Sequence, residues 1–299
     1  MPDKIIETRN LSYHFGLNQV LDQVSLHVES GSIYGFIGPN GAGKTTCIKI
    51  LLNLLQTENN KVFLFGKEFK HNRINILSRI GSLIEQPAIY HHLTGRENLK
   101  NRAQLLKIPI NRVNEILSLV DLNEHADKKA GKYSLGMKQR LGIGLALLPN
   151  PELLILDEPT NGLDPNGIIE IRNLLRKLVY EMGKTVFISS HMLSEVEKMV
   201  SHLGIINQGK LVFQGSLEEL HQISKKQILI QTSMPTKAKE LLLNMGYSVE
   251  LVNETLYLPF QSKEQVAKIN QLLVSNNHSV FSLSQSQDDL ENLFLTITQ

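Results

Sequence analysis

The sequence predicts an α/β fold built on a buried, mostly parallel sheet, followed by a smaller α+β domain. Three observations support this prediction. The apolar run Ile33–Ile37 leads directly into a glycine-rich loop and then a helical pattern. A second apolar run, Leu153–Leu156, has the composition of a strand covered on both faces and ends in two acidic residues. After Leu220 the composition shifts, and the expected elements follow the order strand, helix, strand, strand, helix, strand.

The composition of the chain limits the number of domains, the class of partner and the cellular compartment that we expect. The chain has 299 residues, of which 41% are hydrophobic and 20% charged, enough for one large or two ordinary domains. With 31 basic against 29 acidic residues it lacks a basic excess, and we expect no nucleic acid partner. Cys47 is the only cysteine, which excludes an internal disulfide and favours a reducing compartment. It follows the glycine-rich loop, where we expect a small buried hydrophobe in preference to a reactive thiol.

We expect neither a leader peptide nor a membrane span. The first ten residues, MPDKIIETRN, contain no apolar stretch of the kind found in signal peptides. No apolar run approaches the roughly 20 residues that a membrane-spanning helix needs. These features predict a soluble or peripheral protein of the cytosol.

The N-terminal part is expected to form antiparallel strands. Residues Ile5–Val28 alternate apolar and polar side chains over short runs separated by turn residues. Phe15 ends one of these runs, ahead of the glycine-rich loop. Its ring has two interpretations that the sequence leaves open: it stacks on an adenine base, or it belongs to the core of the strand group.

The glycine-rich loop carries the pattern G-x-x-x-x-G-K-[ST] between the strand and the helical run Cys47–Leu55. Glycines let successive backbone N–H groups point into one concavity, and the start of a helix favours negative charge. Lys44 can reach the β- and γ-phosphates of a nucleotide, and the Thr45 hydroxyl can bind Mg²⁺. A turn without a ligand would not need the whole pattern in this context. The predicted phosphate-binding residues are Gly38, Pro39, Asn40, Gly41, Ala42, Gly43, Lys44, Thr45 and Thr46.

Further elements follow in order. Val62–Phe65 and Ile80–Ile84 are expected strands, and Leu93–Val120 has apolar residues at helical spacing, as an insert between sheet segments. Ser134 is placed as the N-cap of a helical region that includes Leu141–Leu148.

The strand Leu153–Leu156 ends in Asp157 and Glu158. Two carboxylates at this position are costly unless they meet a metal ion or a partner. Asp157 can hold Mg²⁺ together with Thr45, and Glu158 then lies close enough to polarise an attacking water molecule. The alternative for each carboxylate is a solvated turn residue.

A second strand with a polar end comes later in the chain. A turn before Pro165 opens the expected helix Asn166–Met182, and Thr185–Ser189 is the next buried strand. His191 follows it, at the strand end where open α/β sheets place their ligand contacts. Leu203–Ile206 and Lys210–Phe213 flank a hairpin turn.

Taken together, these motifs resemble the nucleotide-binding subunit of an ABC transporter. The resemblance covers about residues 4–221, and five motifs occur in the family's order. It implies a P-loop NTPase of ABC type, with an antiparallel β subdomain and a helical insert at about residues 86–145. The matching segments are the phosphate loop Gly38–Thr45, the signature Ser134–Met137, the Walker B strand Leu153–Glu158, the D-loop Gly162–Asp164, the switch histidine His191 and the adenine-stacking Phe15.

The resemblance also implies a mechanism. Two subunits would face head to tail, with each ATP held between one phosphate loop and the signature helix of the other subunit. Glu158 would be the general base, His191 would position the γ-phosphate, and Asp157 would hold Mg²⁺. Hydrolysis would move an integral membrane permease, to which the protein would bind at the cytoplasmic face of the membrane. The implied contacts of the signature and D-loop with nucleotide are Ser134, Gly136 and Asp164, while Leu135 stands where a glycine is usual and would disturb one backbone contact.

A second departure concerns the residue after the strand Ile80–Ile84. The family usually has glutamine there, whereas aligning the strand and Pro87 puts Glu85 in that position. With its signature residues, this glutamate looks like the branch that exports bacitracin and lantibiotic peptides, often for self-protection. A carboxylate there can accept from water or approach Mg²⁺. The other register makes Gln86 the sensing residue.

The expected domains are residues 1–221, which bind nucleotide, and residues 222–299, an accessory ferredoxin-like unit. The acidic residues Asp288, Asp289 and Glu291 are expected to start a closing helix, Asp288–Ile297. The other expected elements of this unit are Lys225–Thr232, Lys237–Met245 with Gly246 as C-cap, Ser248–Val252, Thr255–Phe260, Glu264–Val274 and Ser279–Leu283.

Two other functions remain possible at this point. A soluble ABC-type ATPase uncoupled from transport would usually carry two phosphate loops or a long coiled coil, and this chain has one loop and no sustained heptads. A nucleotide-binding scaffold without turnover would not need Glu158.

Overall fold

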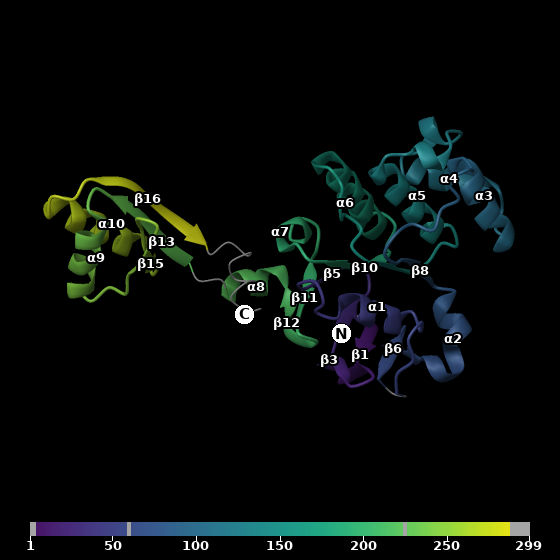
Figure 1. Cartoon of the computed structure of the whole chain (residues 1–299), viewed down its shortest axis with the longest axis horizontal. Coiled ribbons are helices and arrows are strands. Elements are labelled where there is room, and N and C mark those ends of the chain that lie inside the picture. The colour runs from purple at the N-terminus through teal and green to yellow at the C-terminus, as the bar shows by residue number, and fades with distance from the viewer. Residues whose placement is uncertain (1–3, 59–60, 224–225, 288–299) are drawn as a thin grey trace. The chain divides into compact units, whose positions relative to one another are not determined.

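The computed structural model describes residues 4–58, 61–223 and 226–287. The chain divides into two compact units, the first ending at Leu217 and the second beginning at Glu218 (Figure 1). In the described part of the chain, no helix is both long enough and apolar enough to cross a membrane. Each unit is described separately.

The first unit is built around a six-stranded sheet in the order β12-β11-β5-β10-β9-β8. The strands from β11 to β8 run parallel, and β12 is antiparallel to β11. This confirms the predicted parallel sheet and the hairpin. The bounds are β5 (Ile33–Ile37), β8 (Ile80–Leu83), β9 (Leu153–Leu156), β10 (Thr185–Ser190), β11 (His202–Asn207) and β12 (Lys210–Ser216).

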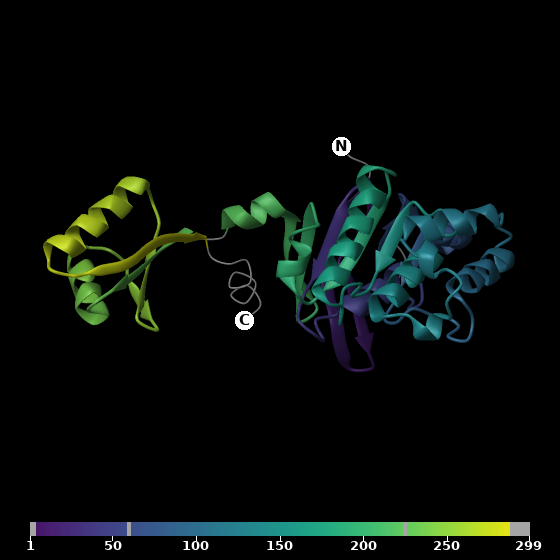
Figure 2. The ribbon, with the colours of Figure 1, turned by 90° about the horizontal axis from the view of Figure 1, so that it is seen from above.

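The register of this sheet positions the functional residues. β10 lies between β5 and β9, with Ser190 opposite Ile37 and Ile188 opposite Leu156. The carboxyl ends of these three strands therefore meet at one edge. All residues of β5, β9 and β10 are buried, because helices cover the sheet. Figure 2 shows α6 (Pro165–Tyr180) lying along the sheet, and α1 (Lys44–Leu51) follows the loop after β5.

Antiparallel strands precede and flank the central sheet, as predicted. They form a four-stranded sheet in the order β4-β1-β6-β7 and a separate hairpin of β2 and β3. A helix that the sequence did not single out, α2 (Phe69–Leu77), follows β7. The strand bounds are β1 (Lys4–Thr8), β2 (Leu11–Phe15), β3 (Asn18–Val24), β4 (His27–Glu29), β6 (Val62–Leu64) and β7 (Lys67–Glu68).

The region Leu93–Val120, expected to be helical, forms two helices, α3 (Gly95–Leu105) and α4 (Asn111–Leu119), with a break around Pro109. The helix predicted over Leu141–Leu148, with Ser134 as its N-cap, is α5 (Leu135–Leu147), which also includes the residues between Ser134 and Leu141. Two short 3₁₀ turns, Asn123–His125 and Ala130–Lys132, precede α5, and α7 (Leu193–Val196) follows β10.

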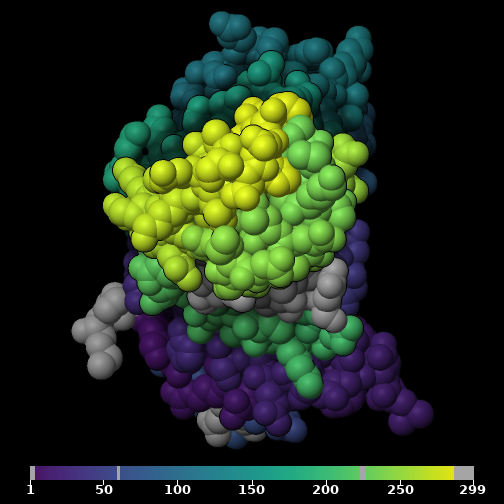
Figure 3. Space-filling model, turned by 90° about the vertical axis from the view of Figure 1, so that its left-hand side faces the viewer, coloured from purple at the N-terminus to yellow at the C-terminus, as the bar shows by residue number. Residues whose placement is uncertain are grey.

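The second unit has the ferredoxin-like strand order β14-β15-β13-β16, which confirms the predicted fold of this part. Its two long helices, α9 and α10, share a small core with the inner faces of the strands, and Gly246 ends α9 with a φ of 83°. Figure 3 shows the face of this unit on which the last described residues, in yellow, lie against earlier ones in green. The closing helix expected at residues 288–297 lies outside the described residues. The elements are α8 (Leu217–Ile223), β13 (Lys226–Thr232), α9 (Pro235–Asn244), β14 (Glu250–Val252), β15 (Thr255–Pro259), α10 (Lys263–Ser275) and β16 (Val280–Gln287).

Candidate functional site

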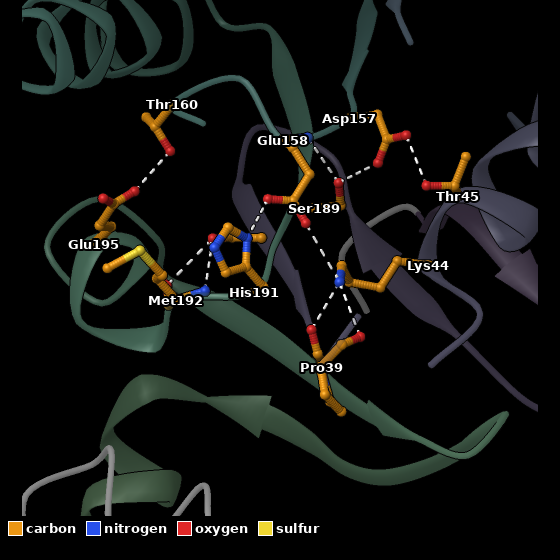
Figure 4. Close-up of polar contacts among 12 residues, drawn as sticks. Pro39, Lys44, Thr45, Asp157, Glu158, Thr160, Ser189, His191, Met192 and Glu195 are labelled. Atoms are coloured by element: carbon orange, nitrogen blue, oxygen red, sulfur yellow. Dashed lines mark hydrogen bonds and ion pairs between the residues drawn. The ribbon is translucent and has the colours of Figure 1, made fainter. Parts of the chain in front are cut away.

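The loop between β5 and α1 holds a lysine in a fixed position (Figure 4). Lys44 Nζ donates to the backbone carbonyls of Gly38, at 2.7 Å, and Pro39, at 3.2 Å, so the loop curls around the ammonium group. Gly43 has a φ of 106°, and a Cβ there would lie 2.9 Å from the carbonyl oxygen of Val20. The loop therefore needs glycine at this point. Since the helix begins at Lys44, its first N–H groups have no intrahelical acceptor and are available to an anion.

A hydroxyl and a carboxylate meet beside this loop. Thr45 Oγ1 donates to Asp157 Oδ2 at 2.9 Å, and Asp157 is 2% exposed. These hard oxygen atoms are the ligands that Mg²⁺ prefers. Across the described residues there is no cluster of three or more His, Cys, Asp or Glu side chains placed to hold a metal ion.

Glu158 lies between Lys44 and His191 (Figure 4). Its Oε1 is 3.3 Å from Lys44 Nζ, and its Oε2 is 2.6 Å from His191 Nδ1. Glu158 has a φ of 50°, in the left-handed region that a glutamate rarely adopts. The turn after β9 thus directs this carboxylate towards the phosphate loop. A carboxylate held between an ammonium and an imidazole at such an edge can accept a proton from water.

A cavity of about 740 Å³ opens in front of these groups. Phe15 lines it, and its ring packs edge-to-face on Tyr13 with 52% of the residue exposed. Because the ring is half exposed, the interpretation of Phe15 as strand core is wrong. An aromatic face remains available at the mouth of the cavity. Behind the loop Cys47 is fully buried, as expected of a small hydrophobe, and burial raises the pKa of its thiol to about 12.

Glu85 and Gln86 both line this cavity. The Glu85 carboxylate is 3.0 Å from Lys49 Nζ, and its side chain is 66% exposed. Glu85 also has a φ of 58°, so the chain turns sharply at the end of β8. The ion pair occupies the carboxylate but leaves it accessible to solvent. A role for Glu85 or Gln86 next to a nucleotide therefore stays a prediction.

Three predicted residues of the signature and D-loop, Ser134, Gly136 and Asp164, are not part of the cavity lining, although their neighbours Leu135 and Gly162 are. Ser134 is the N-cap of α5 as predicted, since its hydroxyl accepts from Met137 N at 3.2 Å. Asp164 caps α6 in the same way, accepting from Gly167 N at 3.2 Å. Gly136 lies in the first turn of α5, where a Cβ would make only ordinary contacts, at 3.9 Å from Gly167 and Leu163. Within one chain Ser134 and Asp164 therefore cap helices, and contact of the three residues with a second chain's nucleotide stays a prediction.

The sequence did not single out Ser189. Its side chain is fully buried, and its hydroxyl lies between Asp157 and the backbone of Glu158. Thr160 was missed too; its hydroxyl donates to Glu195 at 2.7 Å and so joins the turn after β9 to α7. Neither residue belongs to a recognisable sequence motif. Only the positions of β9 and β10 in the folded sheet show that these residues lie next to the site.

Comparison with known proteins assigns the family. A model of the ABC transporter family matches residues 21–161. The bacitracin transport ATP-binding protein BcrA of Bacillus licheniformis is 42% identical over 297 residues, which cover 98% of this chain and 97% of the relative. The chain belongs to the ABC transporter family. The ATP-binding domains of this family are ATPases, and this chain is the ATP-binding subunit of an ABC transporter.

Other ABC proteins agree with this assignment. BcrA of Enterococcus faecalis is 40% identical, over 97% of this chain and 95% of the relative. The lantibiotic transport ATP-binding protein SrtF of Streptococcus pyogenes is 38% identical, over 76% of this chain and 99% of the relative. Among solved structures, cbiO1 of Clostridium perfringens, part of an ABC transporter complex, covers 82% of this chain and 98% of its own, with 25% identity and a TM-score of 0.69. A nucleotide-free ABC cassette covers 74% and 94%, with 28% identity and a TM-score of 0.65.

Proposed function

We propose that this ABC subunit binds and hydrolyses ATP to drive export of a bacitracin- or lantibiotic-like peptide through a separate membrane permease. The observation that carries the catalytic part is the meeting of Lys44, Asp157, Glu158 and His191 at one edge of the central sheet. These residues come from three separate strand ends. Their convergence beside a phosphate loop provides the groups that phosphoryl transfer to water requires.

Each group has a distinct role in this proposal. Lys44 and the N–H groups at the start of α1 hold the phosphates of ATP. Thr45 and Asp157 hold Mg²⁺, which neutralises charge on the phosphates when it is bound. Glu158 accepts a proton from the attacking water, and His191 orients Glu158 and contacts the γ-phosphate. Phe15 stacks on the adenine at the cavity mouth.

We propose that two subunits act together, head to tail. Leu135 is 50% exposed and lines the cavity of its own chain, at the start of α5. An exposed leucine at the N-terminus of a helix is suited to contact with another protein surface. In the dimer, the Ser134 and Gly136 end of α5 and the Asp164 turn complete the ATP site of the other subunit.

A permease can bind at a second cavity of about 670 Å³, between β8 and the helices α3 and α5. Gln86 and Pro87 line this cavity and the nucleotide cavity alike. Tyr90 and Leu105 line it as well and are exposed apolar residues at its rim. A membrane subunit inserted there would sense nucleotide through the short segment from Glu85 to Pro87. This arrangement favours a peripheral position at the cytoplasmic face of the membrane.

The substrate class rests on the relatives. The two BcrA proteins align along almost the whole chain, including the second unit, and SrtF aligns over 76% of it. Bacitracin and lantibiotics are peptide antibiotics, so we propose a peptide antibiotic as the exported compound. A soluble ATPase uncoupled from transport would share the ATP site but have no permease.

Two experiments test this function. The purified subunit should hydrolyse ATP with Mg²⁺, and Lys44→Ala should weaken ATP binding. Unchanged nucleotide affinity in that variant would contradict the proposed ATP site.

The second experiment measures resistance. Expression of the subunit with its neighbouring permease should raise resistance to bacitracin or a lantibiotic, and Lys44→Ala should abolish the gain. Normal ATPase activity with no permease bound in membrane pull-downs would instead favour the soluble ATPase.

A further inference from the structure

One buried hydroxyl joins the two carboxylates of the site. Ser189 Oγ donates to Asp157 Oδ1 at 2.5 Å and accepts from Glu158 N at 2.9 Å. The Ser189 side chain is fully buried, near the carboxyl end of β10. Figure 4 shows it between Asp157 and Glu158.

The chemistry of a hydroxyl fixes the direction of both bonds. A backbone N–H can only donate, so the Ser189 oxygen must accept from Glu158. An ionised carboxylate can only accept, so the single Ser189 proton must point to Asp157. Each partner therefore imposes the orientation that the other one needs. Ser189 is fully buried and Asp157 is 2% exposed, and a hydrogen bond in such an interior is electrostatically stronger than one in water.

The first consequence concerns the orientation of Asp157. Its Oδ1 accepts from Ser189, and its Oδ2 accepts from Thr45. The two hydroxyls, from β10 and α1, fix the plane of the carboxylate and keep Oδ2 facing Thr45. Without Ser189, Asp157 could rotate about its terminal torsion, which is soft for this side chain. The position of the metal-binding oxygen would then be poorly defined.

The second consequence concerns the turn that carries Glu158. The left-handed backbone at Glu158 belongs to a sparsely populated region and needs support from its surroundings. The bond from its N–H to Ser189 ties this turn to β10, two residues before His191. Ser189 thus holds Glu158 in place relative to His191.

We propose that Ser189 is a positioning residue that sets the affinity of the site for Mg²⁺ and aligns Glu158 for catalysis. It contacts neither nucleotide nor metal itself, and acts through Asp157 and the Glu158 backbone. The inference rests on the proposed ATPase function. Outer residues that orient metal ligands typically contribute about 10- to 100-fold in metal affinity or activity.

The neighbouring serine provides a matched control. Ser190 is also buried, and its hydroxyl accepts from Met192 N at 3.0 Å, with no carboxylate as partner. Ser189→Ala and Ser190→Ala each remove one buried hydroxyl from adjacent positions of one strand. Only the first change removes the support of Asp157.

The test compares metal affinity in these variants. For the titration, all variants are made in a Glu158→Gln background, so that bound ATP is not hydrolysed during the measurement. Mn²⁺ is titrated into the ATP-bound protein, and electron paramagnetic resonance measures how much of the metal is bound. We expect Ser189→Ala to weaken Mn²⁺ binding and to raise the half-saturating Mg²⁺ concentration for hydrolysis, each about 10- to 100-fold. ATP binding without metal should be unchanged in Ser189→Ala, and the metal affinity unchanged in Ser190→Ala. Ser189→Cys, nearly isosteric but a weak donor, should give an intermediate loss even if the alanine variant folds poorly.

Two outcomes would overturn the inference. Wild-type metal affinity in both Ser189 variants would show that the hydroxyl does not position Asp157. An equal loss in Ser189→Ala and Ser190→Ala would indicate a general structural effect of removing buried hydroxyls. A wild-type protein that shows no metal-dependent hydrolysis would instead overturn the proposed function, on which the inference rests.

Discussion

The His191 ring and the Glu158 carboxylate are joined by a short hydrogen bond, with Nδ1 2.6 Å from Oε2. The other oxygen of Glu158 faces Lys44 Nζ at 3.3 Å. The first contact depends on β10 and β9 being neighbours in parallel register, because His191 and Glu158 are 33 positions apart in the chain. The carboxylate is thereby oriented before any substrate binds.

The first prediction follows from this orientation. Glu158→Gln should retain ATP binding but lower the hydrolysis rate by about 10²- to 10⁴-fold, the usual contribution of a positioned base. Nucleotide binding by fluorescence and steady-state phosphate release measure the two effects. Glu152→Gln is a suitable control, because Glu152 lies at the other end of β9 and pairs with Arg79. Near-normal turnover in Glu158→Gln would contradict the assigned role.

Phe15→Ala should weaken ATP binding. Stacking of a base on an aromatic ring contributes about 1 to 3 kcal/mol, or about a 5- to 150-fold change in Kd. Phe15→Tyr should keep the wild-type affinity, since it preserves the ring. Isothermal titration with ATP measures these values. An unchanged Kd in Phe15→Ala would mean that adenine binds elsewhere.

The segment after β8 permits a paired comparison. If Glu85 is the sensing residue, Glu85→Ala should uncouple ATP hydrolysis from peptide resistance, whereas Gln86→Ala should retain coupling. The reason is that Glu85 lies two residues after the end of β8 and its carboxylate is solvent-accessible. Resistance assays alongside ATPase rates in membranes distinguish the two. The opposite pattern would assign the role to Gln86, which lines both cavities.

Cys47 gives a prediction on reactivity and pH. Burial raises the pKa of its thiol from 9.0 to about 12, so the folded protein keeps the proton where the unfolded chain loses it. The unfolded state therefore binds fewer protons between these values, and this group lowers stability as pH rises from about 9 towards 12. A thiol reagent at pH 8 should label Cys47 only in denaturant. Fast labelling of the native protein would contradict its burial.

Contiguous motifs made the core of the site predictable. The phosphate loop and the two carboxylates after β9 each follow a buried strand, so the local sequence determines both their chemistry and their place on the sheet. Ser189 was not predictable in this way, because it is one of two adjacent serines at the end of β10. Only the register, with Ile188 opposite Leu156, decides that Ser189 faces Asp157.

The first turns of α5 were not recognised as helical from the sequence, for a different reason. The helix was predicted over Leu141–Leu148, with Ser134 as its N-cap, and the polar residues Lys138, Gln139 and Arg140 precede that range. In the structure Gln139 and Arg140 are buried, and Arg140 donates to the Asp121 carbonyl at 2.8 Å. Polar side chains that find partners in the interior do not follow the amphipathic pattern. The break near Pro109, in contrast, has a clear local cause.

The strand order of the central sheet has a consequence for biosynthesis. β5 emerges early, but its two neighbours in the sheet are β10 and β11, which begin at Thr185 and His202. The phosphate loop is therefore synthesised long before β10 and β11. The central sheet next to the loop can form only after most of the first unit has been translated. Products of premature termination before Thr185 would lack both Ser189 and His191, so under the proposed mechanism they would have an incomplete site for hydrolysis.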